Sequence, residues 1–277
     1  MGLPPCHLCT LLLLLCPAGA PFRICAFNMQ RFAGPKAAKV TVMDTLVKIV
    51  SRCDIMVLQE VLDAKGQAVP ALIRALNRSA GPASYAALSS PLLGAGNYQE
   101  RYVFVYRSSR TQLLDSYMYL DENPARPDAL PANPLCALQP ASKALPMLVL
   151  VPQHTVPKKA EAEIDALYDV FLDIQAQWGT QDAFPGDLTP TALVAKKRWA
   201  RSAAGGAVPW LIGDAADTTV RNSTRCASTG SWCTGSAAWG WWCPAQPSPS
   251  TSPARLGSRR PRRWRSVTTT RWRCSWN

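Results

Sequence analysis

The fold is decided by residues 21–60, which read PFRICAFNMQRFAGPKAAKVTVMDTLVKIVSRCDIMVLQE. Residues 22–28 alternate in part between apolar and polar types, which predicts a buried strand ending at Asn28. The middle of the segment has helical spacing, carried by Val42, Thr45, Leu46 and Ile49. The short apolar run 55–58 predicts a core strand with Glu60 at its exit. A strand, a helix and a strand in succession favour an α/β fold.

The rest of the chain continues this alternation. Helical spacing recurs at residues 69–76 and 159–178. Further strands are expected at residues 102–106, 113–120, 148–151 and 210–212. We therefore expect an α/β sandwich with a mixed sheet.

The ends of the expected strands carry polar residues. They are Asn28, Glu60, Glu100, His154 and Asp187. Ligands of open α/β sheets bind outside the strand ends, so a shared cleft is expected. The chain has no P-loop and no glycine-rich dinucleotide fingerprint, which argues against nucleotide-cofactor chemistry.

These residue types suit one kind of chemistry. Asn28, Glu60 and Asp187 offer hard oxygen ligands that suit Mg²⁺ or Ca²⁺ rather than zinc. His154 can shuttle a proton at neutral pH, and Glu100 could accept a hydrogen bond from its ring. A divalent ion, a positioned water and an acid–base pair together hydrolyse phosphodiesters. Taken singly, each residue is at least as commonly structural, so the combination carries the prediction.

The N-terminus indicates secretion. An apolar run at residues 8–15 precedes Ala18-Gly-Ala20, which is typical of a signal peptide cut near Ala20; a buried N-terminal helix is the alternative. We expect localisation in the secretory pathway, secreted or in the endoplasmic reticulum, and no transmembrane helix. That compartment permits disulfides among the seven remaining cysteines. Sequons at Asn77 and Asn222 predict glycosylation.

The positive charge is concentrated in the C-terminal tail. The 277 residues include 30 Lys and Arg against 18 Asp and Glu, which gives a net charge of +12. Residues 221–277 alone contain ten Arg, seven Trp and no acidic residue. The charge therefore does not indicate a nucleic-acid-binding body. This tail has almost no aliphatic residues to build a core, so residues 227–277 are expected to be disordered.

Several strings of the sequence resemble the deoxyribonuclease I family, most densely over residues 22–121 and 145–182. Within the family, Cys25 and the strings Val42-Met-Asp-Thr-Leu46 and Arg52-Cys-Asp-Ile-Met-Val57 are most similar to the like-1 member. The other matching strings are Phe22-Arg-Ile-Cys-Ala-Phe-Asn28, Val57-Leu-Gln-Glu-Val61, Asn97-Tyr-Gln-Glu-Arg-Tyr102, Val151-Pro-Gln-His154, Ala162-Glu-Ile-Asp-Ala-Leu-Tyr-Asp-Val170 and Ala216-Asp-Thr-Thr219.

The resemblance implies a divalent-metal-dependent endonuclease on a four-layer α/β sandwich of the endonuclease/exonuclease/phosphatase type. Such an enzyme cuts DNA from the minor groove with little sequence preference. By motif, Asn28 and Glu60 would help to hold the metal. Glu100 and His154 would form the acid–base pair.

The resemblance also assigns residues elsewhere in the chain. Asp187 would serve both the metal and catalysis, and Tyr98 would contact the minor groove. Asp217 and Thr219 would belong to a structural calcium loop. The implied cofactors are Mg²⁺ and Ca²⁺, the implied partner is DNA, and we expect a monomer.

Three segments depart from the family, at about residues 124–142, 183–195 and 227–277. The family loop Gly-Asp-Phe-Asn-Ala-Asp-Cys is here Gly186-Asp-Leu-Thr-Pro-Thr-Ala192, and deleting one nucleotide from codons for the former yields the latter. One frame over, Ser266-Val-Thr-Thr-Thr-Arg-Trp272 can encode Ile-Ser-Asp-His-Tyr-Pro-Val, a motif of the family. The segments therefore look frame-shifted, through either a sequencing or gene-assembly error or a real degenerate copy.

These losses set the expected organisation and activity. We expect a signal peptide at residues 1–20, an incomplete deoxyribonuclease I-like domain at residues 21–226 without its last strand, and an aberrant tail at residues 227–277. The chain as written is expected to be impaired or inactive, because the family's second histidine and part of its metal loop are absent. Two alternatives stay open: a secreted, non-enzymatic protein whose Arg-rich tail binds anionic polymers, and the sphingomyelinases and inositol phosphatases that share the sandwich.

Overall fold

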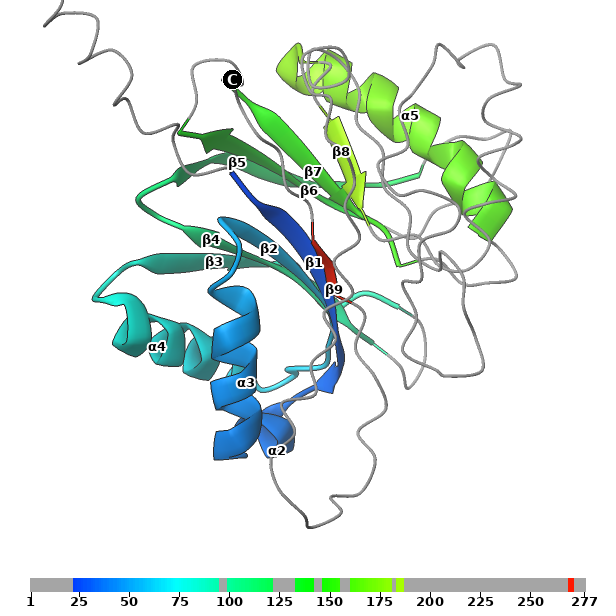
Figure 1. The fold of residues 1–277 in the computed structure, drawn as a ribbon. Helices are drawn as coiled ribbons and strands as arrows, with labels where there is room; N and C mark the ends of the chain where they lie inside the picture. The colour runs from blue at the N-terminus through cyan, green and yellow to red at the C-terminus, as the bar shows by residue number, and fades with distance from the viewer. Residues whose placement is uncertain are drawn as a thin grey trace, which may run out of the picture.

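The computed structural model describes residues 22–94, 99–121, 133–141, 146–154, 160–180, 183–186 and 269–271. Figure 1 shows two β-sheets packed face to face, with helices on both outer faces. In chain order the elements are β1 (Ile24–Phe32), α2 (Gly34–Ala37), α3 (Val40–Val50), β2 (Ile55–Val61), α4 (Ala68–Ala80), β3 (Tyr85–Ser89), β4 (Arg101–Arg107), β5 (Thr111–Tyr119), β6 (Asn133–Pro140), β7 (Leu148–Pro152), α5 (Ala160–Trp178), β8 (Ala183–Gly186) and β9 (Thr269–Arg271).

Both sheets are mixed. The first has the strand order β3-β4-β2-β1-β9, in which β1 and β2 run parallel. The second has the order β5-β6-β7-β8, in which β7 and β8 run parallel. Since parallel strands need a crossover, α3 connects β1 to β2 and α5 connects β7 to β8. The C-terminal ends of β1 and β2 therefore lie at the same edge of the first sheet.

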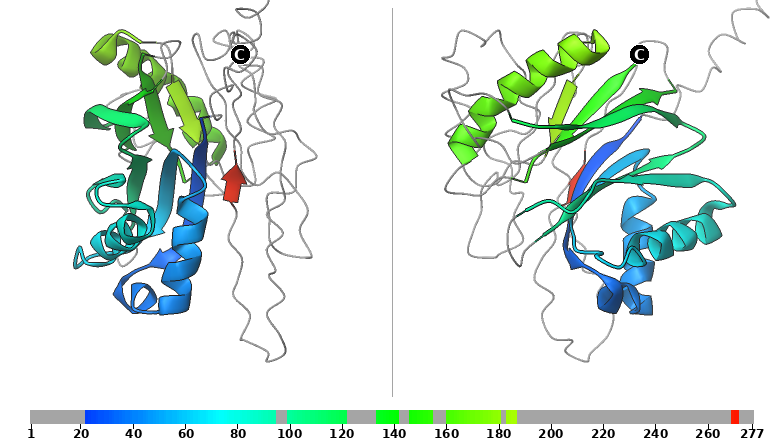
Figure 2. Two further views of the ribbon diagram at one scale, coloured as in Figure 1. Left: turned by 60° about the vertical axis from the view of Figure 1, so that its left-hand side comes forward. Right: turned by 180° about the vertical axis from the view of Figure 1, so that it is seen from behind.

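Three apolar clusters hold the layers together. The first lies between the two sheets and includes Ile55 and Leu150. The second packs the first sheet against α3 and α4, through residues such as Leu46 and Leu72. The third packs the second sheet against α5, where Leu167 is buried. The order helix, sheet, sheet, helix (Figure 2) confirms the expected four-layer α/β sandwich.

The strands β1 and β2 become irregular where they carry the polar residues. Asn28 pairs with Gln59 and Phe32 pairs with Val61, so three residues of β1 lie opposite the single residue Glu60. Glu60 has a φ of 52°. Side chains rarely adopt positive φ, and bulges of this kind re-aim side chains beside functional sites. Here the irregularity turns Glu60 toward Asn28.

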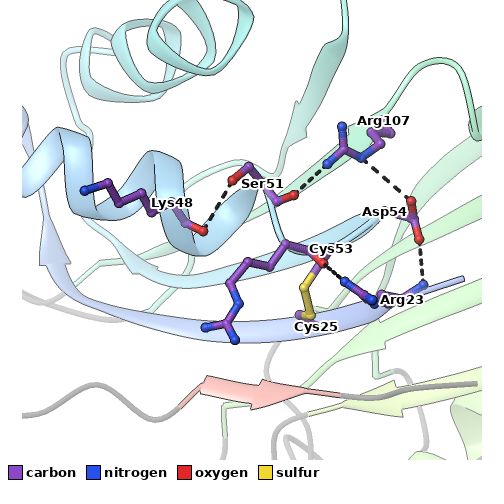
Figure 3. The surroundings of a disulfide bond; sticks show 8 residues. Arg23, Cys25, Lys48, Ser51, Cys53, Asp54 and Arg107 are labelled. Carbon is purple, nitrogen blue, oxygen red and sulfur yellow. Dashed lines mark hydrogen bonds and ion pairs between the residues drawn. A yellow bond between two sulfur atoms is a disulfide. The ribbon is translucent and has the colours of Figure 1, made fainter. Parts of the chain in front are cut away.

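The opposite edge of the first sheet is held by a disulfide. Cys25 in β1 bonds to Cys53 just before β2, with a Cα–Cα distance of 6.2 Å. Figure 3 shows Asp54 beside it, accepting a 2.7 Å hydrogen bond from the backbone N–H of Arg23 and facing Arg107 across 3.7 Å. These contacts tie the starts of β1 and β2 to the end of β4.

One expectation about the fold is corrected. The last strand was expected to be missing from a disordered tail, yet Thr269–Arg271 form β9 and pair antiparallel with β1 (Figure 2), with Thr269 opposite Phe27. Pairing at a sheet edge uses main-chain groups, and β-branched threonines fit a strand, which accounts for the pairing of this segment. The strand expected at residues 210–212 lies outside the described residues. None of the described helices has the length and apolar character needed to cross a bilayer.

Candidate active site

Four of the five residues expected at strand ends lie at one edge of the sandwich. Glu60 is the penultimate residue of β2. Asn28 was expected to end its strand, but β1 continues through residues 29–31 to Phe32, so Asn28 ends only the regular part of its pairing with β2. Glu100 directly precedes β4, whose first residue pairs with the last residue of β2. His154 lies two residues beyond β7 of the second sheet. The parallel and antiparallel pairings thus bring residues far apart in sequence to the same end of both sheets.

Asn28 and Glu60 form one hydrogen-bonded pair. Nδ2 of Asn28 donates to Oε1 of Glu60 over 2.7 Å, and Oδ1 of Asn28 accepts a 2.8 Å bond from the backbone N–H of Gln30. The two bonds fix which way the Asn28 amide faces. Both residues of the pair are only half-buried, so the pair lies partly at the surface of the protein.

Glu100 and His154 form the second pair. Nδ1 of His154 lies 2.9 Å from Oε1 of Glu100, and both side chains are mostly buried. The backbone N–H of His154 donates to the Tyr102 hydroxyl over 2.8 Å, which joins the second sheet to β4 of the first. The preceding Gln153 is anchored to α5 by a 3.0 Å bond from Nε2 to Oε2 of Glu163. His154 is therefore positioned from both sheets and from α5.

A lysine that the sequence pattern did not indicate completes the surroundings of the first pair. Nζ of Lys36 donates to the carbonyls of Met29 and Gln30 over 2.9 and 3.0 Å. Burial lowers the pKa of Lys36, the nearby carboxylate of Glu60 acts in the opposite direction, and Lys39 lowers it further. No periodicity or motif of the sequence identified this lysine as part of a site.

The donor set of the first pair fits a magnesium-like ion. Mg²⁺ keeps several of its waters and is commonly held by only one or two carboxylates. Glu60 supplies a carboxylate and Asn28 an amide oxygen, both hard donors. No cluster of three or more His, Cys, Asp and Glu side chains suited to a metal occurs among the described residues. The pair therefore fits an ion that retains water and does not fit a tetrahedral zinc site.

Several expected site residues lie outside the described residues. β8 ends at Gly186, which pairs with Pro152 two residues before His154, so the described chain stops at the same edge immediately before the expected Asp187. The residues in question are Tyr98, Asp187, Asp217, Thr219 and Asn222.

The sequon at Asn77 lies in α4, and its side chain is engaged. Nδ2 of Asn77 donates to the carbonyl of Tyr85 over 3.1 Å, and Oδ1 accepts from the Tyr85 backbone N–H over 2.7 Å. The Asn77 amide thus links α4 to the start of β3. A glycan on Nδ2 would have to keep or replace this contact.

Comparisons with known proteins identify the family of the chain. The profile of the Endonuclease/Exonuclease/phosphatase family matches residues 25–184. Deoxyribonuclease-1-like 1 of Sus scrofa is 50% identical over 228 residues, covering 79% of this chain and 70% of the relative. The human protein of that name is 48% identical, covering 78% of this chain and 72% of its own. Deoxyribonuclease-1 of Oryctolagus cuniculus is 40% identical, with 79% coverage of both chains.

Solved structures support the fold independently. An endonuclease/exonuclease/phosphatase family protein from Bacteroides thetaiotaomicron superposes with a TM-score of 0.53 at 11% identity, covering 78% of this chain and 81% of the other. Its counterpart from Bacteroides vulgatus has a TM-score of 0.51 at 17% identity, covering 78% and 87%. The identity to these proteins is too low to indicate more than the fold. Together with the profile and the curated relatives, they show that this chain belongs to the endonuclease/exonuclease/phosphatase family, and within it to the deoxyribonuclease I group.

Proposed function

We propose that this protein hydrolyses phosphodiester bonds of DNA as a divalent-metal-dependent endonuclease. The observation that carries the proposal is the presence of two pairs at one sheet edge, Glu100 with His154 at 2.9 Å and Asn28 with Glu60 at 2.7 Å. One pair has the composition of an acid–base device and the other that of a hard-cation site. The names of the relatives, which are deoxyribonucleases, make DNA the substrate class.

The protein's own residues account for the proton transfer. A carboxylate at Nδ1 favours the tautomer that carries its proton there, which leaves Nε2 of His154 as the atom that takes a proton from the attacking water. Glu100 then stabilises the imidazolium, and the same ring can return the proton to the leaving oxygen. Tyr102 fixes the backbone N–H of His154, and the preceding residue Gln153 is anchored to Glu163, so the backbone that leads into the ring is held in place. A bound divalent ion would neutralise charge on the phosphate.

The finer assignments follow the family resemblance. We propose Mg²⁺ at Asn28 and Glu60, completed by Asp187, and Ca²⁺ at a loop containing Asp217 and Thr219. Tyr98 would insert into the minor groove, and the protein would act as a monomer. The hard oxygen donors of Asn28 and Glu60 support the choice of Mg²⁺.

The activity of the chain as written should be low. The segment after Gly186 lacks the family's second loop aspartate, and the tail lacks its second histidine. Removing members of a catalytic unit costs orders of magnitude with non-additive effects. We therefore expect the chain as written to be impaired or inactive, with no more than trace metal-dependent nicking.

A plasmid-nicking assay tests the proposal. Residues 21–277 are incubated with supercoiled DNA in Mg²⁺ and Ca²⁺, and the same reaction is run in EDTA and with Glu60→Gln. We expect nicked circles only with the metals present, and at least about 100-fold fewer with the variant, which keeps the shape of Glu60 but removes its charge. Equal nicking by wild type and Glu60→Gln would assign the activity to a contaminant and refute the proposal. No nicking by the wild type would refute it for this chain.

We also propose that the protein enters the secretory pathway and is secreted or retained in the endoplasmic reticulum. The leader-like residues 1–20 and the disulfide between Cys25 and Cys53 support this, because disulfides persist in oxidising compartments. Expression in cultured cells should yield a chain that begins near residue 21, as read by N-terminal mass spectrometry. No finding favours the alternative of a non-enzymatic binder of anionic polymers.

A further inference from the structure

Lys36 clamps the main chain next to the candidate metal pair. Its ammonium group donates to two successive carbonyls, those of Met29 and Gln30, over 2.9 and 3.0 Å. The short helix α2 (Gly34–Ala37) carries Lys36 back toward β1. The side chain is partly buried, which favours a fixed contact over a solvated one.

The clamped segment has a strained conformation. Gln30 and Arg31 have φ values of 48° and 60°, and neither residue is glycine. Two consecutive side-chain-bearing residues in the left-handed region persist only where their surroundings hold them. Lys36 supplies such a constraint from outside the strand, because it binds the carbonyls of the two peptide groups that flank the Cα of Gln30.

The strained segment is hydrogen-bonded to the candidate metal pair, Asn28 and Glu60. The backbone N–H of Gln30, the first left-handed residue, donates to Oδ1 of Asn28 over 2.8 Å. Nδ2 of the same amide donates to Glu60 over 2.7 Å. An unbroken chain of contacts therefore runs from Lys36 through the Gln30 peptide to the Asn28 amide and the Glu60 carboxylate.

We propose that Lys36 is a positioning residue that holds the left-handed bend at Gln30 and Arg31, and thereby orients Asn28 and Glu60 to bind a divalent cation. This inference rests on the proposed function. Its alternative is a purely electrostatic role, in which a positive charge near Glu60 opposes a cation. The two roles predict opposite effects when the charge is removed.

A metal-binding experiment separates the two roles without requiring activity. Free Mn²⁺, a spectroscopic substitute for Mg²⁺, is counted by electron paramagnetic resonance during titration of the full chain. The Mn²⁺ binding that is present in wild type and absent from Glu60→Gln is assigned to the site at Asn28 and Glu60. Lys36→Met should raise the dissociation constant of that site about 10-fold, the lower range for loss of an outer contact to a metal ligand. Lys36→Arg keeps the charge but replaces one ammonium nitrogen with a planar guanidinium, so its dissociation constant should lie between those of wild type and Lys36→Met.

Lys48→Met is the matched control. Lys48 is an exposed lysine in the last turn of α3, so the substitution removes the same charge from the same layer. Its effect on the Mn²⁺ constant should be less than about twofold, because the charge of an exposed lysine is screened by salt. A comparable weakening in both variants could not come from the lost charge, which would favour cation binding, and would assign the effect to a general loss of structure, overturning the clamp.

A glycine rescue distinguishes positioning from general loss of folding. Gln30→Gly removes the conformational penalty of a positive φ, so the bend needs less external support. Adding Gln30→Gly to Lys36→Met should therefore recover most of the lost Mn²⁺ affinity. Melting temperatures in EDTA, read by circular dichroism, should change much less than the affinity. Lack of rescue, or binding by Lys36→Met as tight as wild type or tighter, overturns the proposal.

The outcomes also separate this inference from the proposed function. A wild-type chain that binds Mn²⁺ through Glu60 and loses affinity in Lys36→Met, but nicks no DNA, would support the clamp and refute the nuclease. A chain that nicks DNA, and whose Mn²⁺ affinity does not change in Lys36→Met, would support the nuclease and refute the clamp. A chain that binds no Mn²⁺ through Glu60 would refute both.

Discussion

Replacing Cys25 and Cys53 together with alanine should lower the free energy of unfolding by about 3.6 kcal/mol. The disulfide joins residues separated by 28 positions in the chain. A loop of that length restricts the unfolded chain by about 12 cal/mol/K, which gives about 3.6 kcal/mol at 25 °C. Both sulfur atoms lie in buried residues packed among the second apolar cluster, so the substitution leaves a small cavity that adds to the loss.

The metal pair should be insensitive to the same change. The disulfide lies at the start of the paired region of β1 and β2, whereas Asn28 and Glu60 lie toward its other end. Between them, β1 and β2 keep a regular parallel ladder from Ile24 with Ile55 to Asn28 with Gln59. Mn²⁺ affinity and plasmid nicking at 25 °C should therefore change less than about twofold, since the ladder alone fixes the register.

Urea unfolding followed by far-ultraviolet circular dichroism provides the measurement. Wild type in a reducing agent should unfold like the double alanine variant, and the variant should respond to reductant hardly at all. A loss below about 1 kcal/mol would refute the reasoning, because it would mean that this loop is already constrained in the unfolded chain. A variant that responds to reductant as strongly as wild type would show that a different bond carries the stability.

Three further predictions concern single residues. His154→Ala should reduce nicking by about 10²- to 10⁴-fold while leaving Mn²⁺ binding unchanged, and a parallel loss of binding would contradict a proton-transfer role. Burial would raise the pKa of Asp63, but the backbone N–H groups at the start of α4 outweigh it and lower that pKa. The stabilisation is therefore present above the ordinary value of 3.8 and is lost as the pH falls below it. Asp63→Asn should thus cost about 1–2 kcal/mol at pH 7 and almost nothing near pH 2, as measured by urea unfolding; a constant cost at both pH values would exclude the carboxylate as its source. Burial raises the pKa of the Cys136 thiol to about 12, so iodoacetamide at pH 8 should alkylate it only in urea, as peptide mapping would detect; rapid labelling of the native chain would show that the thiol is accessible.

The sequence pattern predicted the elements whose apolar residues follow one period. In α3 the buried residues are Val42, Leu46 and Val50, a stripe that repeats every turn. β2 and β7 were recognisable as short apolar runs because both their faces are buried. Glu60, Glu100 and His154 were found because each stands at or next to the end of such an element, and Asn28 because it ends the regular part of β1.

The remaining features depend on contacts between distant parts of the chain. β6, with the sequence NPLCALQP, shows no alternation because it lies inside its sheet, between β5 and β7, with both faces covered. The partner of Cys25 could not be chosen from spacing, since seven cysteines follow the leader and many pairings are open. The clamp by Lys36 arises from a bend in β1 that contains no glycine and so left no signal in the sequence.

The bend in β1 makes chain length at this point as important as side-chain identity. Three residues of β1 lie opposite Glu60, and Phe32 beyond them returns to full burial against the helices. Losing a single codon from residues 29–31 would rotate Phe32 onto the other face of the sheet, whereas many substitutions there would leave its direction unchanged. Homologous proteins should therefore show many substitutions across residues 29–31 but few insertions or deletions.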